Sequence, residues 1–443
     1  MKINLAMLIR LLMLILLLWG CEAEETGIKP NPDILNNTEP LINVRIINTL
    51  EEIKVKFHGS WSIENSTKSF SRNDGIIVTQ VEGYVVFTDK NGENITSDEF
   101  IVLKPETKRT ELEIAGVPYG VGWWWEGKEN RKYEGIVSFY PTPSGKPEVI
   151  ISLPMEEYLK GVVPYEIGGD SPLEALKAQA VAARSEAVIA LKSDMYRGPN
   201  HDLTSDVECQ VFSGNNRRTQ YSDEAVRATR GIILTNDGKP INAYYASNCG
   251  GHSELIENVW PDRPRPESYK HTHIDSDVQN EMDLISENGV TEWIKSKPEV
   301  YCNPENGINL PEWSQKNFRW ERKFKINELS EMLNPEQNLG AFIGIKPLKR
   351  GVSGRIIKAE ILFEKDTITT KTELELRQLF KPSLRSSCFI VEKENNEVII
   401  KGAGWGHGVG MCQSGAVSMA HTNSTFQEIL EHYYTNAVLN IIY

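Results

Sequence analysis

The N-terminus constrains this chain most strongly, because it decides in which compartment the rest of the chain must fold. Lys2 and Arg10 precede an unbroken apolar run over residues 11–19. A membrane-spanning helix needs about 20 apolar residues, so this run is too short to be one. Its layout is typical of an export signal. We therefore expect a protein that works outside the cytoplasm.

The export signal is followed directly by a cysteine. Residues 18–21 read Leu-Trp-Gly-Cys and resemble the cleavage box of bacterial lipoproteins, in which the cysteine is lipidated and becomes the mature N-terminus. The alternative is an ordinary signal peptide that happens to end near a cysteine. We favour a lipoprotein whose signal peptide is residues 1–20 and whose lipid on Cys21 anchors a soluble body to the membrane.

Composition narrows the classes of protein further. The 443 residues allow about two or three domains, and 48 basic against 61 acidic residues give a formal net charge of −13. This acidic balance argues against nucleic-acid binding, which normally needs a basic patch. An odd number of cysteines remains beyond Cys21, so at least one stays free or binds something else. These are Cys209, Cys249, Cys302, Cys388 and Cys412.

The apolar pattern predicts an α+β fold that is rich in strands. Residues 21–40 are polar and turn-rich, which is typical of a flexible spacer. Residues 41–128 alternate like strands and predict a small β-rich N-terminal module. Residues 133–443 predict a second, β-rich domain with a few packed helices and an irregular surface insertion at about 262–303. The run Trp123–Trp125 is of a kind that more often fills a core or a domain seam than contacts sugar rings.

A single glutamate is the first candidate for chemistry. Glu166 is expected in a loop between an apolar strand and a helix that starts after the cap Ser171 with Pro172 at its first position. A loop carboxyl on a rigid scaffold suits catalysis, but a general acid at neutral pH needs apolar surroundings that raise its pKa. The nearby helix N-terminus favours the carboxylate instead. On pattern alone, a solvated loop residue is the commoner outcome.

Two further segments combine glycines with residues that can contact a ligand. Residues 244–254 predict a strand followed by a Gly-Gly turn, and residues 402–416 alternate glycines with Trp405 and His407. Alternate glycines let the backbone approach a ligand closely. Their spacing of two is not that of a dinucleotide-binding loop. A purely structural turn is the alternative for each segment alone.

Together, the segments 155–185, 244–254 and 402–416 resemble the SpoIID/LytB family of bacterial cell-wall proteins in order and spacing. The resemblance extends from about Tyr133 to the C-terminus. It implies a SpoIID-like domain that acts on peptidoglycan. In sporulation members, one Glu protonates the glycosidic oxygen and then acts as base while the muramic 6-hydroxyl closes on C1, which leaves a 1,6-anhydro end.

The resemblance also implies roles for individual residues. The family's catalytic Glu follows a Val-Val-Pro segment and corresponds to Glu166. Glu156 and Glu157 are then expected as a surface pair, and Glu174 as a helix-capping residue. The substrate contacts implied are Arg184, Ser247, His252, Gly406, His407, Gly408 and Gln413.

The resemblance is incomplete where metal is concerned. Some sporulation members bind zinc through His and Cys residues between the helix and a Cys-Gln-Val segment, but only His201 and Cys209 remain in that stretch here. A tetrahedral structural site needs four ligands, and Cys249 and His252 are the remaining candidates. A Cys209–Cys249 disulfide, or two free thiols, is the alternative. We therefore assign no metal and no cofactor.

The predicted function is that of a lytic transglycosylase, tethered to the membrane in the cell envelope, that cleaves peptide-stripped glycan strands. Its partners would be these strands and the membrane, with no nucleic acid. Other members of the family are amidase enhancers, which bind the wall or a cell-wall amidase without cutting, and a nonenzymatic sugar-binding lipoprotein is a third alternative. Glu166 favours the enzyme, because a pure enhancer need not keep it. Sporulation, division and general wall turnover all stay open as the setting.

Overall fold

The computed structural model describes residues 28–443 apart from residues 32, 109, 124, 279–281 and 337. The expected signal peptide and Cys21 lie outside the described residues. The chain is mixed, with 32% strand and 23% helix, which confirms the predicted α+β class. Among the helices of the described part, none combines the length and the apolar character that crossing a membrane requires.

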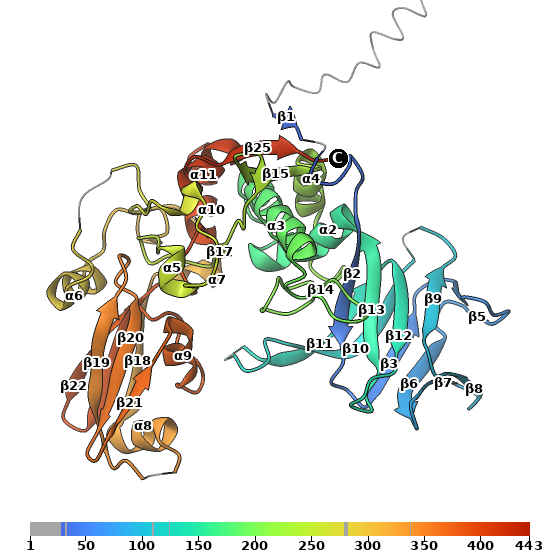
Figure 1. Ribbon diagram of the computed structural model, residues 1–443, viewed down its shortest axis with the longest axis horizontal. Coiled ribbons are helices and arrows are strands. Elements are labelled where there is room, and N and C mark those ends of the chain that lie inside the picture. Colours follow the sequence, from blue (N-terminus) through green and yellow to red (C-terminus); the bar gives the residue numbers. More distant parts are fainter. Residues whose placement is uncertain (1–27, 32, 109, 124, 279–281, 337) are drawn as a thin grey trace, which may run out of the picture.

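Two sheets form the N-terminal part of the molecule (Figure 1). One sheet has the strand order β11-β10-β3-β6-β7-β8 and the other β14-β2-β13-β12-β9-β4-β5. In β3, Ile53, Val55 and Phe57 are buried while the residues between them are exposed, the alternation of a half-buried strand. The strands are β2 (Leu41–Ile47), β3 (Glu52–Phe57), β4 (Trp61–Ile63), β5 (Ser69–Phe70), β6 (Gly75–Val81), β7 (Tyr84–Asp89), β8 (Asn94–Ser97), β9 (Ile101–Pro105), β10 (Leu112–Tyr119), β11 (Gly127–Tyr133), β12 (Ile136–Tyr140), β13 (Glu148–Pro154) and β14 (Leu203–Thr204).

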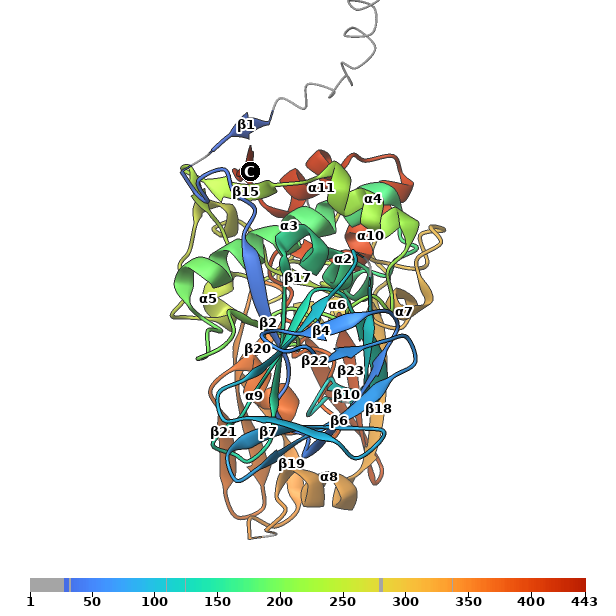
Figure 2. The same ribbon diagram turned by 90° about the vertical axis from the view of Figure 1, so that its right-hand side faces the viewer.

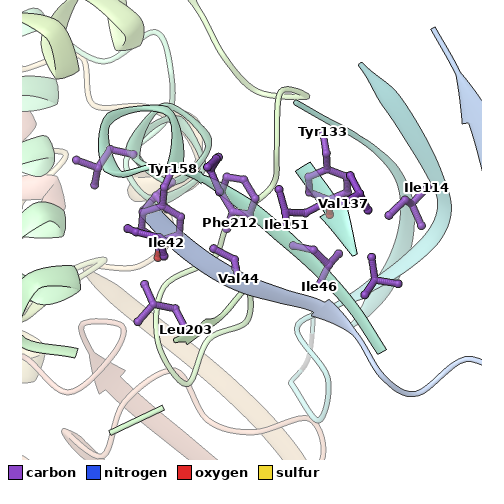
Figure 3. Packing of buried hydrophobic residues seen from close by; sticks show 14 of the residues in the cluster. Ile42, Val44, Ile46, Ile114, Tyr133, Val137, Ile151, Tyr158, Leu203 and Phe212 are labelled. Atoms are coloured by element: carbon purple, nitrogen blue, oxygen red, sulfur yellow. The ribbon is translucent and has the colours of Figure 1, made fainter. Parts of the chain in front are cut away.

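The second of these sheets connects the two expected domains. Strand β2 pairs with β13 on one side, from Leu41 opposite Pro154 to Ile47 opposite Val149, and with β14 on the other. Figure 3 shows the core that results, in which apolar side chains of β2 pack with Tyr158 and Phe212. Four strands of residues 41–128, β2, β4, β5 and β9, therefore share a sheet with β12, β13 and β14, and residues 41–128 share a core with the helices that follow β13.

Three helices follow β13 and form the centre of the molecule: α2 (Met155–Glu166), α3 (Leu173–Ser193) and α4 (Gln220–Ala228). The predicted helix after Pro172 is confirmed as α3. Its alanines are buried because α2, α4 and two C-terminal helices, α10 (Gln413–His421) and α11 (Phe426–Tyr433), pack closely around it (Figures 1 and 2). The predicted serine cap is wrong, since the hydroxyl of Ser171 donates to the carbonyl of Ile167 (2.6 Å) instead of accepting from the helix.

Two glutamates differ from their expected roles. Glu174 accepts a hydrogen bond from the backbone N–H of Phe426 (2.8 Å), so it caps α11 and not its own helix. Glu156, expected on the surface, is buried in an ion pair with Arg184. Both differences arise from partners that are distant in the sequence.

The strands of residues 319–403 form a separate apolar unit (orange tones in Figure 1). It consists of two three-stranded sheets, β18-β23-β22 and β19-β20-β21, and the predicted strands near residues 318–320, 356–363 and 389–400 are confirmed within it. The elements are β18 (Arg319–Lys325), α8 (Ile326–Leu333), β19 (Phe342–Arg350), β20 (Ile356–Phe363), β21 (Thr367–Thr370), α9 (Glu373–Gln378), β22 (Phe389–Glu394) and β23 (Glu397–Ala403).

Short elements complete the central part of the molecule. A four-stranded sheet has the order β1-β25-β15-β16, and β17 pairs in parallel with β24. Part of the expected spacer, β1, is therefore paired with the C-terminal strand. These elements are β1 (Lys29–Pro30), β15 (Ile232–Asn236), β16 (Lys239–Pro240), β17 (Tyr245–Ala246), α5 (Ile256–Val259), α7 (Glu312–Gln315), β24 (Met411–Cys412) and β25 (Val438–Ile441).

The expected surface insertion is more deeply packed than its polar composition indicates. It contains a short 3₁₀ helix, η1 (Glu267–Tyr269), and α6 (Glu287–Lys295). Ile274, Trp293 and Cys302 are buried in the core around β24 and α11. Widely spaced apolar residues in a polar segment give no periodic signal, which explains why the sequence pattern did not reveal this packing.

Candidate functional site

A cleft of about 570 Å³ lies between the end of α2, the β10–β11 hairpin, α9 and the glycine-rich segment before α10. In Figure 1 the β10–β11 hairpin extends toward α9. Five of the residues predicted from the sequence line this cleft: Glu166, Ser247, Gly406, His407 and Gln413. Arg184, His252 and Gly408 are not among the lining residues.

Glu166 is the last residue of helix α2, whereas the sequence pattern predicted a loop after a strand. Apolar residues at 155, 158, 159, 162 and 163 recur at helical spacing, and this stripe outweighs the β-branched pair before Pro164. Gly161 lets the ring of Phe212 pack against the helix, because a Cβ there would lie 2.4 Å from that ring. This close packing brings the segment around Val211 to the end of α2.

The surroundings of Glu166 favour a neutral carboxyl group. Burial in the wall of the cleft raises its pKa to about 7, against the opposing effects of the Val211 N–H and of the Gln413 side chain. The Val211 N–H donates to Oε1 over 3.0 Å. A carboxyl group with such a pKa exchanges protons at neutral pH, as a general acid or base must.

Gln413 is held in place by a second amide. Its Nε2 donates to Oε1 of Gln179 on α3 over 3.1 Å, and both side chains are buried. In the same part of the molecule, the hydroxyl of Tyr245 donates to Oε1 of Gln210 (2.8 Å), and Gln210 donates to the carbonyl of Ala183 (3.2 Å). These hydrogen bonds of the glutamine side chains fix the wall of the cleft around the carboxyl group of Glu166.

The two motif segments with glycines are joined directly beside this carboxyl group. Tyr245 and Ala246 pair with Met411 and Cys412 through the parallel strands β17 and β24. Trp405 exchanges backbone hydrogen bonds with Asn248, of 2.8 and 3.2 Å. The hydroxyl and the backbone of Ser414 both donate to the carbonyl of Ser247. Residues distant in the sequence therefore form one wall of the cleft.

The alternating glycines of this wall are required by the backbone. Gly404, Gly406, Gly408 and Gly410 all have positive φ, between 73° and 99°, a region that other residues rarely adopt. Gly408 additionally faces the guanidinium of Arg355, which would lie 2.4 Å from a Cβ. The glycines thus serve as a structural turn, and this turn places Trp405 and His407 in the cleft.

His407 is held neutral. Burial, together with the positive charges of Arg355 and Arg377, lowers its pKa to about 3. Its Nδ1 accepts from the N–H of Val409 (3.0 Å), so the proton is on Nε2. The ring packs 4.7 Å from that of Trp260. His407 is therefore a fixed neutral part of the wall.

Aromatic side chains form much of the remaining surface of the cleft. Trp123 and Trp125 stack on each other with centroids 5.1 Å apart, and Trp125 meets Trp405 edge-on at 5.3 Å. The guanidinium of Arg377 lies 5.3 Å from the ring of Trp123. The further aromatic residues of the lining are Tyr165, Tyr245, Trp260 and Trp313. Sugar rings, which have apolar faces, suit such partly exposed aromatic surfaces.

Arg184 has a different environment from the one predicted. It is fully buried in α3, and its guanidinium makes two bonds, of 2.9 and 2.8 Å, to the carboxylate of Glu156. It also donates to the carbonyl of Ile232 (3.0 Å), and the hydroxyl of Tyr443 donates to Glu156 (2.6 Å). This arrangement connects α2, α3 and the C-terminus.

The residues considered for zinc do not come together. His201 lies between Arg45 and Glu148, 3.4 Å from each, and the Nδ1 of His252 is 2.7 Å from the carbonyl of Ser253. The donor clusters found among the described residues include no group with His201, Cys209 or His252. A zinc ion shared by these residues therefore does not fit.

Sequence reasoning missed several residues of the site. Val211 and Gln210 belong to the Cys-Gln-Val segment that attracted attention only for zinc, and Gln179 lies among the alanines of α3. Tyr245 carries no signal beyond its place in a motif. Their roles depend on which side chain a helix or strand turns toward the cleft.

The sequence of this chain is similar to known protein families and to known proteins. A family model described as stage II sporulation protein (SpoIID) matches residues 144–236, which include Glu166, and a domain of unknown function (DUF8618) matches residues 254–410. An uncharacterized protein of Brachyspira hyodysenteriae (strain ATCC 49526 / WA1) is 31% identical over 308 residues, 68% of this chain and 71% of that protein.

Two relatives from Bacillus carry functional names. A stage II sporulation protein D of Bacillus amyloliquefaciens is 27% identical over 299 residues, 64% of this chain and 73% of that protein. A protein of Bacillus subtilis (strain 168) named amidase enhancer is 28% identical over 297 residues, 63% of this chain. The match spans only 40% of the length of that amidase enhancer.

Proposed function

Because this chain belongs to the SpoIID/LytB family and has a cell-wall-related role, we propose that it is a peptidoglycan lytic transglycosylase in which Glu166 is the single general acid and base. The observation that carries the proposal is the place of Glu166 in an aromatic cleft, with a backbone donor on one of its oxygens. The substrate is the glycan strand freed of its stem peptides.

The reaction needs one carboxyl group in two protonation states. Protonated Glu166 gives its proton to the glycosidic oxygen as the bond from that oxygen to C1 of the muramic acid breaks. The 6-hydroxyl of the same sugar then forms a bond to C1, and its proton returns to the Glu166 carboxylate. The products are a 1,6-anhydro end and a free 4-hydroxyl, so no water is consumed.

The groups around Glu166 suit both halves of this cycle. Burial favours the neutral acid before bond cleavage, while the Val211 N–H and the Gln413 side chain stabilise the carboxylate afterwards. The other acidic residue of the lining, Glu373, lies 3.3 Å from the guanidinium of Arg377.

The aromatic wall supports binding of a polysaccharide. Trp123, Trp125 and Trp405 offer adjoining ring surfaces on which consecutive sugars can stack. The amide of Gln413 and the hydroxyl of Ser247 add polar groups for the sugar hydroxyls. Such a surface supports recognition of the glycan strand itself.

Digestion of stripped glycan strands tests the proposal. The purified full chain should release fragments with 1,6-anhydro ends, and Glu166→Gln should abolish this release. Glu157→Gln is the matched control, because Glu157 is in the same helix but more than a third exposed at its side chain, and it should cut like the wild type. Equal cutting by Glu166→Gln would remove Glu166 from the mechanism.

A second candidate function is amidase enhancement, which the name of the Bacillus subtilis relative favours. An enhancer would stimulate a cell-wall amidase without producing 1,6-anhydro ends. Stimulation that survives in Glu166→Gln, together with no cutting by the wild type, would support this function instead.

We also propose that the protein is held in the cell envelope by lipid on Cys21. Metabolic labelling with a fatty acid should mark the wild type and not Cys21→Ser. Equal labelling of the wild type and of Cys21→Ser would contradict the lipid anchor on Cys21, since no other cysteine directly follows the export signal.

A further inference from the structure

Four potential metal ligands converge in the core beside the cleft. Cys249 follows β17, Cys412 ends β24, and Asp275 and Cys302 come from the insertion. Their donor atoms all lie within 4.8 Å of one another, and all four residues are at most 4% exposed. We propose that Cys249, Asp275, Cys302 and Cys412 bind one structural zinc ion.

The distances suit a tetrahedral ion. The sulfurs of Cys249 and Cys302 are 3.6 Å apart, and Oδ2 of Asp275 is 3.3 Å from the Cys249 sulfur. With Zn–S bonds of about 2.3 Å and Zn–O bonds of about 2.1 Å, the edges of a tetrahedron measure roughly 3.6–3.8 Å. Three thiolates and one carboxylate complete the four ligands of a closed, structural site, and soft sulfur donors favour zinc over calcium or magnesium.

Backbone N–H groups point at the sulfurs as they do around bound thiolates. The N–H groups of Cys249 and Gly415 donate to the sulfur of Cys412 over 3.2 and 3.4 Å, and the N–H of Gly251 donates to the sulfur of Cys249 over 3.3 Å. Cys412 is also the N-cap of α10, where the helix dipole favours negative charge. Ordinary buried thiols need no such donors.

The carboxylate is oriented from its other side. Oδ1 of Asp275 accepts from the hydroxyl of Tyr433 (2.7 Å) and lies 3.5 Å from Nε2 of His432. These contacts leave Oδ2 directed at the sulfurs. Outer partners of this kind hold a ligating carboxylate in position.

Two arginines offset the negative charge of such a site. Arg319 and Arg355 donate to the carbonyls of Gly250 (3.0 Å) and Cys249 (3.2 Å), in the loop that carries one of the ligands. The zinc ion itself supplies the rest of the compensation that three buried thiolates and a carboxylate require. These ligands are distinct from the stretch between His201 and Cys209.

The proposed ion would connect the insertion to the wall of the cleft. Cys412 directly precedes Gln413, whose side chain interacts with Glu166. Losing the ion should therefore loosen both the insertion and the start of α10. The proposal stands on its own geometry and does not depend on the proposed reaction.

Metal content of the purified full chain tests this inference directly. Elemental analysis should find one zinc ion per chain, and replacement by cobalt should give the sulfur-to-metal charge-transfer bands of a tetrahedral thiolate site. Cys302→Ser should lose the metal, Asp275→Asn should bind it at least tenfold more weakly, and Cys388→Ser should bind it normally. Cys388 is the matched control because it is equally buried outside the cluster.

Thiol protection in the wild type keeps the test independent of the folding of variants. Zinc should protect Cys249, Cys302 and Cys412 from alkylation, and a chelator should expose them, whereas alkylation of Cys388 should not depend on zinc. Three reactive thiols in the presence of zinc would overturn the proposal. A Cys249–Cys302 disulfide in protein isolated without reductant would overturn it equally.

Discussion

The backbone N–H of Val211 donates a 3.0 Å hydrogen bond to Oε1 of Glu166. This bond connects the end of α2 to a loop 45 residues away in the sequence. It opposes the effect of burial, which raises the pKa of Glu166 to about 7. The balance of the two effects sets the protonation state of this carboxyl group near neutral pH.

The activity should depend on pH through the protonated form of Glu166. The value of kcat/KM should be level below about pH 6 and fall about tenfold per unit above pH 7, because only the neutral acid can protonate the leaving oxygen. Initial rates on stripped glycan strands across this range check the prediction. A profile that rises steadily above pH 7 would contradict the role as acid.

Gln413 should adjust the pKa of Glu166. Its side chain lowers this pKa, so the similarly sized Gln413→Met should raise it and shift the alkaline limb of the profile to higher pH. A purely structural defect would lower kcat without moving the limb. A limb that moves to lower pH would contradict the electrostatic account.

Glu166 should reduce stability at neutral pH. Its pKa is about 4.5 when unfolded and about 7 when folded, so the folded state keeps a proton that the unfolded state has lost between these values. Stability therefore falls as pH rises through this window, by at most about 3 kcal/mol, and stays reduced above it.

Urea unfolding at pH 4 and pH 8 checks this sign. Glu166→Gln should match the wild type at the lower pH and exceed it at the higher pH, because the amide has no charge to bury. Glu157→Gln, on the exposed side of the same helix, should show no such gain. A variant that is less stable than the wild type at pH 8 would count against the buried-acid account.

Trp125 should contribute to glycan binding. Trp125→Ala removes a ring that contacts both Trp123 and Trp405, and KM should rise about tenfold, in line with an aromatic contact of about 1.4 kcal/mol. Trp125→Phe should recover most of the loss. An unchanged KM in Trp125→Ala would show that this part of the cleft does not contact the strand.

Arg184 should matter for stability and not for binding. Arg184→Met leaves the carboxylate of Glu156 buried without its positively charged partner, so the free energy of unfolding should fall by about 3–5 kcal/mol. Adding Glu156→Gln should restore part of it, while KM stays unchanged below the melting temperature. A raised KM in a variant as stable as the wild type would show that Arg184 contacts the substrate, as the family resemblance implies.

The pattern of the sequence predicted the elements better than the partners of individual side chains. The strand β3 follows from a regular alternation of apolar and polar residues, β13 from a continuous apolar run, and α3 from its start signal at Pro172 and its many alanines, all of which can be read from the local sequence. The helix α2 was misjudged because Val162, Val163 and Pro164 outweighed a helical stripe in our interpretation. The deep packing of the insertion depends on contacts with α11 that no local pattern contains.

In the site, too, the sequence predicted which segments come together better than it predicted the partners of single side chains. The three motif segments predicted that Glu166, His407 and Gln413 lie together, and these residues do line one cleft. Arg184 belongs to the same motifs, but its partner Glu156 is on a neighbouring helix, which spacing alone does not reveal. Tertiary packing determines which side chains pair across helices. It also determines the environments of Trp123 and Trp125.

The most direct test of the central claim is digestion of stripped glycan strands in water enriched in heavy oxygen, followed by mass spectrometry of the new ends. The account predicts ends that are lighter than hydrolysis products by one water molecule and that carry no heavy oxygen, because the muramic 6-hydroxyl, and not water, attacks C1. Ends that incorporate the heavy oxygen would show hydrolysis and contradict the account.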